Sequence, residues 1–362
     1  MIQDRITALR DFLREKNLDG VIINKLENVF YFSGFTGDDT MLVVSAEDAA
    51  LVTDFRYIEQ ATAETPLFRI VKQEKGFIQK LAETISSMKI NRIGFEGAAL
   101  VWDWYGQIKN NLPDNALLES VNLNSLRQIK EKEEIECIRQ AMSISDKAFD
   151  DILRFIRPGI SENAVAARLE NVMRSLGSQR PAFTTIVASG RRGSLPHGTA
   201  TEKLINPGEF VTMDYGAVYK GYHSDMTRTV CVGKADAKQR EVYDAVLEAQ
   251  LLGVSLVKPG ASCREVDGEV RRFLDRHGFA EYFGHGLGHS LGLEIHEAPS
   301  LSPRNEGTKL MANVLITVEP GVYIPDWGGV RIEDTVLVTD NGREILTSSP
   351  KELIEIPYSA DF

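Results

Sequence analysis

Histidine is the side chain that most often binds metal ions and that titrates nearest to neutral pH. All six histidines of this 362-residue chain lie after residue 190. Half of them fall in the short stretch GHGLGHSLGLEIHEAP, residues 284–299, and these are His285, His289 and His296. The remaining ones are His197, His223 and His277. This concentration indicates that the second half of the chain contains the chemistry.

Acidic residues stand at the ends of apolar segments in the same half. Asp214 follows the predicted strand FVTM, and Asp225 opens another predicted strand. The glycine-containing return AVYKGYH between them predicts a β-hairpin across which the two aspartates face each other. Glu319 ends the apolar strand VLITV, which the following Pro-Gly pair terminates.

The segment GGVRIEDTVLV, residues 328–338, is predicted to be one strand. Alternation of side chains along a strand would place Arg331, Glu333 and Thr335 on one face. We therefore expect Arg331 to point where Glu333 points.

The second half also contains a weak internal duplication. FIRPGIS at 155–161 resembles LVKPGAS at 256–262, and each reads as a helix end, a Pro-Gly break and the serine cap of the next helix. The acidic residues and histidines repeat as well, in VTMDYG and ITVEPG (211–216 and 316–321), in 225–227 and 333–335, and in PHGT and IHEA (196–199 and 295–298). A pseudo-twofold axis relating the halves would bring four carboxylates to a common centre.

Four carboxylates buried together without partners would cost several kcal/mol each. Two divalent cations would balance their charge, and oxygen ligands with one imidazole suit Mn²⁺, Co²⁺, Fe²⁺ or Zn²⁺. A water shared by two such ions loses a proton near neutral pH and could attack a carbonyl.

Spacing alone does not decide which histidine would bind the metal. His285 and His289 are four residues apart, but the glycines around them disfavour a helix. Each of these two and His296 could equally be a hydrogen-bonded core residue. For His223 and His277 we expect that structural role.

Several motifs follow one another in the second half. They are PHG (196–198), MDYG (213–216), SDMTRT (224–229), GHGLGH (284–289), IHEAP (295–299), EPGVY (319–323) and GGVRIED (328–334). Together they resemble the pita-bread metallopeptidases, a family that includes aminopeptidase P, prolidase and methionine aminopeptidase, with creatinase as a metal-free relative. NVFYFSGFTG and TDFRYIEQA in the first half resemble the N-terminal domain of prolidase, aminopeptidase P and creatinase, which methionine aminopeptidases generally lack.

The resemblance implies a dinuclear metal centre. The positions that match its ligands are Asp214, Asp225, His289, Glu319 and Glu333. His197, His285 and His296 match histidines near the substrate, and Arg331 matches an arginine near the metal carboxylates. Glu319 would also act as the general base. The implied reaction is hydrolysis of the Xaa-Pro bond at the N-terminus of dipeptides or short peptides. A small departure is Ser290 after GHGLGH, where the family usually has glycine.

We expect two domains. Residues 1–125 would form a creatinase-like α/β domain, and residues 126–362 an α+β pita-bread catalytic domain with a pseudo-twofold internal repeat. In the first domain the pattern predicts a helix that closes near Asp19-Gly20, the strands GVIINK, MLVVSA, AALVTD and RIGFEG, and a helix over 77–88. The charged run at 130–134 would mark the boundary as a solvated helix start.

The composition limits the kinds of binding partner and the cellular compartment to be expected. A net charge of −11 argues against a nucleic-acid partner. The start of the chain has no apolar run typical of a signal peptide or membrane span. Three scattered cysteines, Cys137, Cys231 and Cys263, are expected to be small buried residues and indicate a reducing compartment, so we expect a cytoplasmic protein. The resemblance implies a homodimer.

Three questions stay open at this point. The loop at 33–40 is either a plain connection or reaches a substrate site. Nothing in the motifs separates dipeptide substrates from longer peptides. The alternative functions are a methionine aminopeptidase-like peptidase and a non-catalytic pita-bread binding module.

Overall fold

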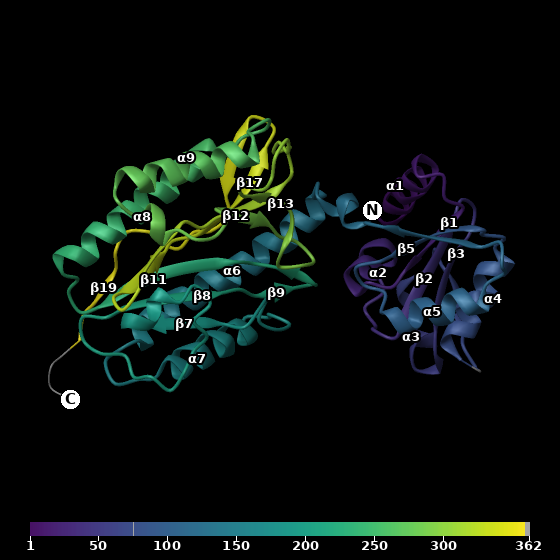
Figure 1. Ribbon diagram of the computed structural model, residues 1–362. Coiled ribbons are helices and arrows are strands. Elements are labelled where there is room, and N and C mark those ends of the chain that lie inside the picture. The colour runs from purple at the N-terminus through teal and green to yellow at the C-terminus, as the bar shows by residue number, and fades with distance from the viewer. Residues whose placement is uncertain (75, 359–362) are drawn as a thin grey trace. The chain divides into compact units, whose positions relative to one another are not determined.

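The computed structural model describes residues 1–74 and 76–358. The chain divides into two compact units, Met1–Arg127 and Gln128–Phe362 (Figure 1). Among the described residues, none of the helices combines the length and apolar character needed to span a membrane.

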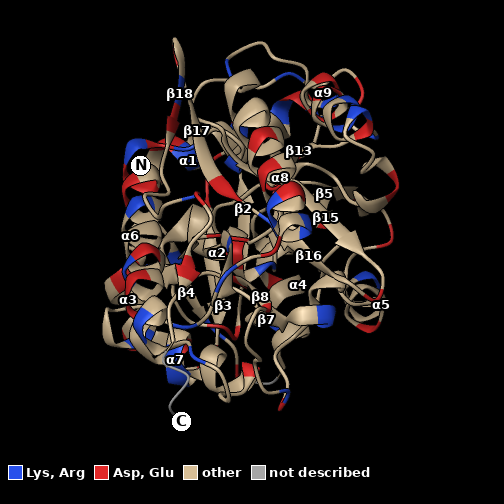
Figure 2. Ribbon diagram, turned by 90° about the vertical axis from the view of Figure 1, so that its left-hand side faces the viewer, with Lys and Arg blue, Asp and Glu red and all other residues tan. Residues whose placement is uncertain are grey.

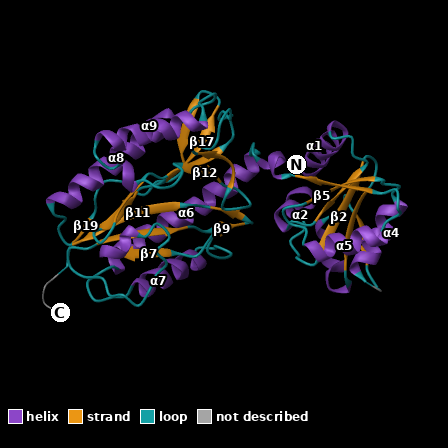
Figure 3. Ribbon diagram, in the orientation of Figure 1, coloured by secondary structure: helices purple, strands orange, loops and turns teal. Residues whose placement is uncertain are grey.

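A mixed six-stranded sheet forms the centre of the smaller unit, with helices packed on it (Figure 3). The strand order is β4-β3-β2-β1-β5-β6, with β1 antiparallel to β2 and parallel to β5. The strands are β1 (Gly20–Ile23), β2 (Thr40–Ser45), β3 (Ala49–Thr53), β4 (Arg69–Lys72), β5 (Arg92–Glu96) and β6 (Leu117–Val121). The helices are α1 (Ile2–Glu15), α2 (Leu26–Ser33), α3 (Ile58–Glu64), α4 (Phe77–Ser87) and α5 (Trp102–Asn111).

The α/β class predicted for this unit is confirmed, and so are the four predicted strands. Strands β4 and β6 were not predicted, because most of their residues are exposed or half-buried and they lack an apolar run. The first helix ends at Glu15, earlier than predicted, because Asn17 adopts a left-handed conformation with φ of 54°.

The larger unit places its strands between two helix pairs, α6–α7 on one side and α8–α9 on the other (Figure 1). The helices are α6 (Lys132–Phe155), α7 (Glu162–Ser175), α8 (Ala237–Leu256) and α9 (Cys263–Arg276). The strands up to the second helix pair are β7 (Ile186–Ser189), β8 (Phe210–Tyr215), β9 (Val218–Tyr219), β10 (Tyr222–His223) and β11 (Met226–Val232). Those after it are β12 (Gly288–Ser290), β13 (Glu297–Leu301), β14 (Leu315–Val318), β15 (Gly321–Ile324), β16 (Gly328–Arg331), β17 (Asp334–Thr339), β18 (Gly342–Ile345) and β19 (Glu355–Ile356).

Two hydrophobic cores correspond to the two helix pairs. Phe149 of α6 and Leu169 of α7 pack in the same cluster as Met213 of β8. Val246 of α8 and Val270 of α9 pack in the same cluster as Ile316 of β14. Each half of the unit therefore buries one helix pair against its own strands, as the predicted repeat requires.

The helix junctions repeat in detail. Gly159 and Gly260 have φ of 85° and 80°, in the left-handed region that favours glycine. Ser161 then caps α7 by accepting a hydrogen bond from the Ala164 amide, and Ser262 caps α9 in the same way. The Pro-Gly and serine pattern thus encodes the same turn twice, and the predicted internal repeat is confirmed.

Asp214 and Asp225 face each other from the antiparallel strands β8 and β11, as predicted, although the register pairs Asp214 with Thr227 and Asp225 lies just before β11. One local prediction about the strands was wrong. The segment at 328–338 is not one strand. It breaks at Ile332 and Glu333, because β16 pairs with β15 whereas β17 pairs with β14.

The charged run at 130–134 is only partly solvated, contrary to the prediction. The side chains of Lys130 and Glu134 are buried. Glu134 accepts a hydrogen bond from the Glu131 amide at the start of α6, and Lys130 contacts Glu297. Acidic and basic residues are interspersed along α8 and α9 (Figure 2).

The serine caps provide a test of this architecture. We expect Ser161→Ala to lower the free energy of unfolding by about 1 kcal/mol, because the Ala164 amide loses its partner. Ser175→Ala is the control, since the Ser175 hydroxyl only donates to carbonyls within the last turn of α7. Urea unfolding of the two variants measures the difference, and equal effects would contradict the assigned cap.

Candidate metal centre

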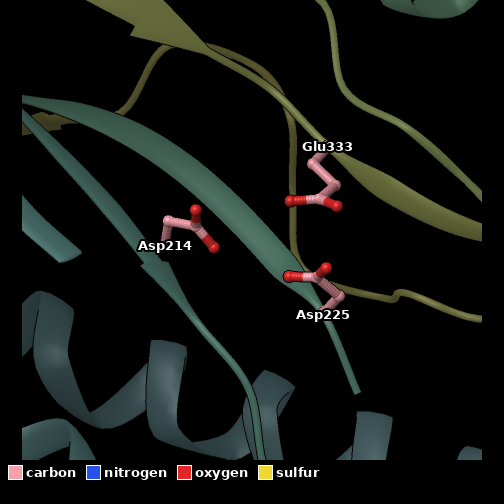
Figure 4. A group of neighbouring side chains, drawn as sticks. All are labelled: Asp214, Asp225 and Glu333. Atoms are coloured by element: carbon pink, nitrogen blue, oxygen red, sulfur yellow. The ribbon is translucent and has the colours of Figure 1, made fainter. Parts of the chain in front are cut away.

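Three carboxylates of the larger unit converge on one point (Figure 4). Asp214 lies on β8, Asp225 immediately before β11, and Glu333 between β16 and β17. Each offers an oxygen within 4.8 Å of the others, and their side chains are turned toward one another. The group joins both halves of the repeat, because Glu333 belongs to the second half.

Glu319 and His289 complete the set. The His289 Nε2 atom lies 3.4 Å from Glu319 Oε1 and 3.5 Å from Asp225 Oδ2. Its Nδ1 lies 3.1 Å from the Ser290 carbonyl, which orients the ring. The residues named from the sequence as metal ligands are therefore neighbours in the fold.

Burial of these acids perturbs their ionisation. Burial, and then the charge of Glu333, raise the pKa of Asp225 well above its ordinary value. Burial, and then the charge of Glu319, do the same to the pKa of Glu333. Burial likewise raises the pKa of Glu319 to about 7. Such carboxylates stay ionised only if positive charge compensates them.

The donor set fits divalent cations. Asp214 Oδ1 and Glu333 Oε1 are buried and, within the described part of the chain, have no hydrogen-bond partner. Burial lowers the pKa of the His289 imidazole, which keeps the ring neutral as a metal ligand must be. Free oxygen lone pairs beside a neutral imidazole are what a borderline divalent ion requires.

Hydroxyl and guanidinium groups hold the carboxylates in place. The Thr227 hydroxyl donates to Glu333 Oε2 at 2.7 Å and accepts from Arg331 Nε at 3.0 Å. Arg331 Nη2 lies 2.7 Å from Asp214 Oδ2. Thus Arg331 does reach the carboxylate cluster despite the broken strand. The sequence offered only the alternation of threonines on β11 as a signal for Thr227.

A close backbone approach explains one glycine of GHGLGH. A Cβ atom on Gly288 would lie 1.9 Å from the carbonyl oxygen of Thr317. The side chain of Thr317 also accepts a hydrogen bond from the His289 amide and donates to Glu319 Oε1. Gly288 therefore lets β12 approach β14 and brings His289 to Glu319.

A cavity of about 550 Å³ opens onto the carboxylates. Besides His289, three histidines named from the sequence lie in its wall: His197 on an exposed turn, His296 just before β13, and His285. The His296 and His289 ring centroids are 4.4 Å apart in an edge-to-face contact. Phe183 and Ile295 add apolar surface to the same wall.

Tyr323 links His285 to the cluster and was not singled out from the sequence. Arg331 Nη1 donates to the Tyr323 hydroxyl at 2.9 Å, so the hydroxyl can donate to His285 Nε2 at 2.9 Å. Burial lowers the pKa of His285 to about 4, so its Nε2 is free to accept this bond at neutral pH. The position of Tyr323 in the motif EPGVY was the available signal.

The remaining histidines and the cysteines lie elsewhere. His223 is buried and its Nδ1 is 3.1 Å from the Gly292 carbonyl, as expected for a core histidine. His277 is exposed at the end of α9, so the expectation of a core position was wrong. Cys137 is half-buried, contrary to expectation, while Cys231 and Cys263 are buried; all three are free thiols.

Comparison with known proteins identifies the class. Residues 136–340 match metallopeptidase family M24, and residues 5–129 match the creatinase/prolidase N-terminal domain. The chain belongs to this metallopeptidase family, and the resemblance seen in its motifs is confirmed. Family membership implies divalent metal ions, in agreement with the donor set.

Individual relatives resemble the chain over nearly its whole length. A Xaa-Pro dipeptidase of Pyrococcus furiosus is 41% identical over 98% of this chain and 100% of the relative. The solved structure of a Xaa-Pro dipeptidase from Bacillus anthracis is 43% identical, with a TM-score of 0.96 over 98% of this chain and 100% of that one. That of an X-Pro aminopeptidase from Thermotoga maritima is 36% identical, with a TM-score of 0.89 over 97% and 99%.

The raised pKa values predict how the metal-free protein responds to pH. Because the pKa of Glu319 is about 7 in the folded state and 4.5 ordinarily, the folded protein retains a proton that the unfolded chain releases. The stability that this retained proton contributes is fully present below the ordinary pKa of Glu319 and is lost as the pH rises through the folded-state pKa. We expect the urea concentration at the unfolding midpoint, measured in EDTA, to fall as the pH is raised from about 5 to about 8.

The matched control is Glu319→Gln in EDTA, which should show a smaller fall because it lacks the titrating group. Excess Mn²⁺ should raise the midpoint most at the higher pH. A midpoint in EDTA that stays level or rises over this range would contradict the assignment.

Proposed function

We propose that this protein hydrolyses the bond between an N-terminal residue and a following proline, in dipeptides or short peptides. The observation that carries the proposal is the convergence of Asp214, Asp225, His289, Glu319 and Glu333 on one cavity that His197 and His296 also line. Relatives of nearly equal length are named for this reaction. Proline removes the amide N–H and restricts the backbone, so its peptides call for a dedicated site.

The proposed metal centre is dinuclear. Asp214, Asp225, His289, Glu319 and Glu333 would hold the ions. Two ions would balance the four acidic charges, and Mn²⁺ or Co²⁺ is the proposed metal, with Zn²⁺ or Fe²⁺ as alternatives. When bound, the ions supply an acidified water and positive charge for the substrate carbonyl oxygen.

The protein's own groups would move the protons. Glu319, whose Oε1 is oriented by the Thr317 hydroxyl, would accept the proton of the attacking water. His197 and His296 would stabilise the charge on the carbonyl oxygen and assist departure of the proline nitrogen. His285 would line the proline side, and Arg331 would keep Asp214 oriented through their 2.7 Å contact.

The matched N-terminal domain supports this function over that of a methionine aminopeptidase. The complete set of ligand-type residues supports an enzyme over a purely binding module. We further propose a homodimer in the cytoplasm. The three free cysteines suit a reducing compartment, and the net charge of −11 disfavours nucleic acid as a partner.

The substrate class can be tested with purified protein. We expect Mn²⁺- or Co²⁺-loaded protein to cleave Ala-Pro or Ala-Pro-Ala and to leave Met-Ala intact. Comparing the two proline peptides across a panel of Mn²⁺, Co²⁺, Zn²⁺ and Fe²⁺ identifies both the metal and the substrate length. Failure to cut either proline peptide with any of these metals would overturn the proposal.

The histidine roles predict a separation of catalysis from metal binding. We expect His197→Ala and His296→Ala to lower kcat roughly 10²- to 10⁴-fold while bound metal is retained, since neither is proposed as a ligand. His277→Ala is the control, because His277 is exposed at the end of α9. If kcat in the first two variants matched that of the control, the assigned roles would be wrong.

A further inference from the structure

A lysine at the start of the larger unit reaches the back of the metal-centre hairpin. Lys130 precedes α6, and its side chain is 1% exposed. Its Nζ atom lies 2.9 Å from Glu297 Oε2 and 3.4 Å from Ser290 Oγ. The Glu297 side chain is 4% exposed, so this is a buried ion pair.

Each of the two residues that Lys130 contacts directly follows a histidine of the site. Ser290 directly follows His289 on β12, and Glu297 directly follows His296 at the start of β13. Ser290 and Glu297 are register partners in this antiparallel pair, with an irregularity between His289 and Ser290. His289 and His296 contact each other and line the cavity, whereas Ser290 and Glu297 contact Lys130.

Glu297 also fixes the turn that leads into His296. Its second oxygen, Oε1, accepts a hydrogen bond from the Glu294 amide at 3.1 Å. One carboxylate therefore ties the turn to Lys130, and Lys130 in turn is tied by its own amide to the Asn313 carbonyl at 2.9 Å, just before β14. Through these contacts Lys130 connects the start of β14, the strand that leads to Glu319, with the segments that contain His289 and His296.

We propose that Lys130 is a positioning residue for catalysis: through Glu297 and Ser290 it sets where His289 and His296 stand relative to the carboxylates. This inference rests on the proposed function of those two histidines. A buried ion pair adds little net stability, because desolvation offsets its attraction, but it imposes one geometry. A displaced imidazole weakens both metal binding and substrate alignment.

The effect should appear in kcat and in metal affinity. Groups that orient metal ligands change affinity or activity roughly 10- to 100-fold when removed. We therefore expect Lys130→Met to lower kcat and raise the Kd for Mn²⁺ by factors in this range, with KM nearly unchanged. Lys203→Met is the matched control. The Lys203 Nζ atom lies 2.7 Å from Glu209 Oε2, and this Lys–Glu pair is not part of the hairpin.

A double variant separates position from stability. Lys130→Met alone removes the cation that faces the buried Glu297 carboxylate, which destabilises the fold. In Lys130→Met/Glu297→Gln both charges are gone while the acceptor for the Glu294 amide remains, so the thermal midpoint should return toward that of the wild type. We expect kcat to stay low in this variant even so.

The proteins are compared by calorimetric Mn²⁺ titration, by steady-state kinetics on a Xaa-Pro peptide and by thermal unfolding. Recovery of kcat together with stability in the double variant, or an unchanged kcat and Kd in Lys130→Met, would overturn the positioning role. If Lys130→Met does not fold, the double variant decides alone. Wild-type protein that binds no Mn²⁺ would overturn this inference and the proposed function together, whereas an active wild type with an equally active variant overturns only the role of Lys130.

Discussion

The larger unit brings together carboxylates that are buried or half-buried and therefore repel one another. Asp214, Asp225 and Glu333 present oxygens within 4.8 Å of one another, and Glu319 lies beside them. Burial of this kind costs several kcal/mol per uncompensated charge, which is a large share of the net stability of a folded domain. The stability and the chemistry of the larger unit are therefore coupled. The positive charge that would allow these carboxylates to stay ionised is also the charge that would activate a substrate.

The duplicated fold makes such convergence available. Strands of both halves meet at the carboxylate cluster, and hydrogen bonds join the two halves there. The Thr227 hydroxyl of the first half donates to Glu333 of the second, and the Thr335 hydroxyl of the second half donates to the Asp225 carbonyl of the first. Each half thus orients an acidic residue of the other. The β12–β13 hairpin then adds the imidazole, a component for which the first half has only the turn around His197 as a counterpart.

Prediction from sequence succeeded where a residue's role follows from its own segment. The acidic residues at strand ends and the Pro-Gly-Ser junctions are local patterns, and they led to the internal repeat and to the candidate centre. It failed where the role depends on a distant partner. Lys130 was taken for a solvated residue because its neighbours are charged, yet it pairs with Glu297, which is 167 residues away. The break at Ile332 was missed because alternation continues through it, although the flanking strands join different sheets.

The number of metal ions bound per chain tests the central claim most directly. Metal-free protein can be titrated with Mn²⁺ in a calorimeter near pH 6.5, and repeating the titration in buffers of different ionisation enthalpy counts the protons released. We predict two ions per chain and release of protons, because the raised pKa values of Asp225 and Glu333 leave protons for the metal to displace. Absence of saturable Mn²⁺ binding, or binding without proton release, would contradict it.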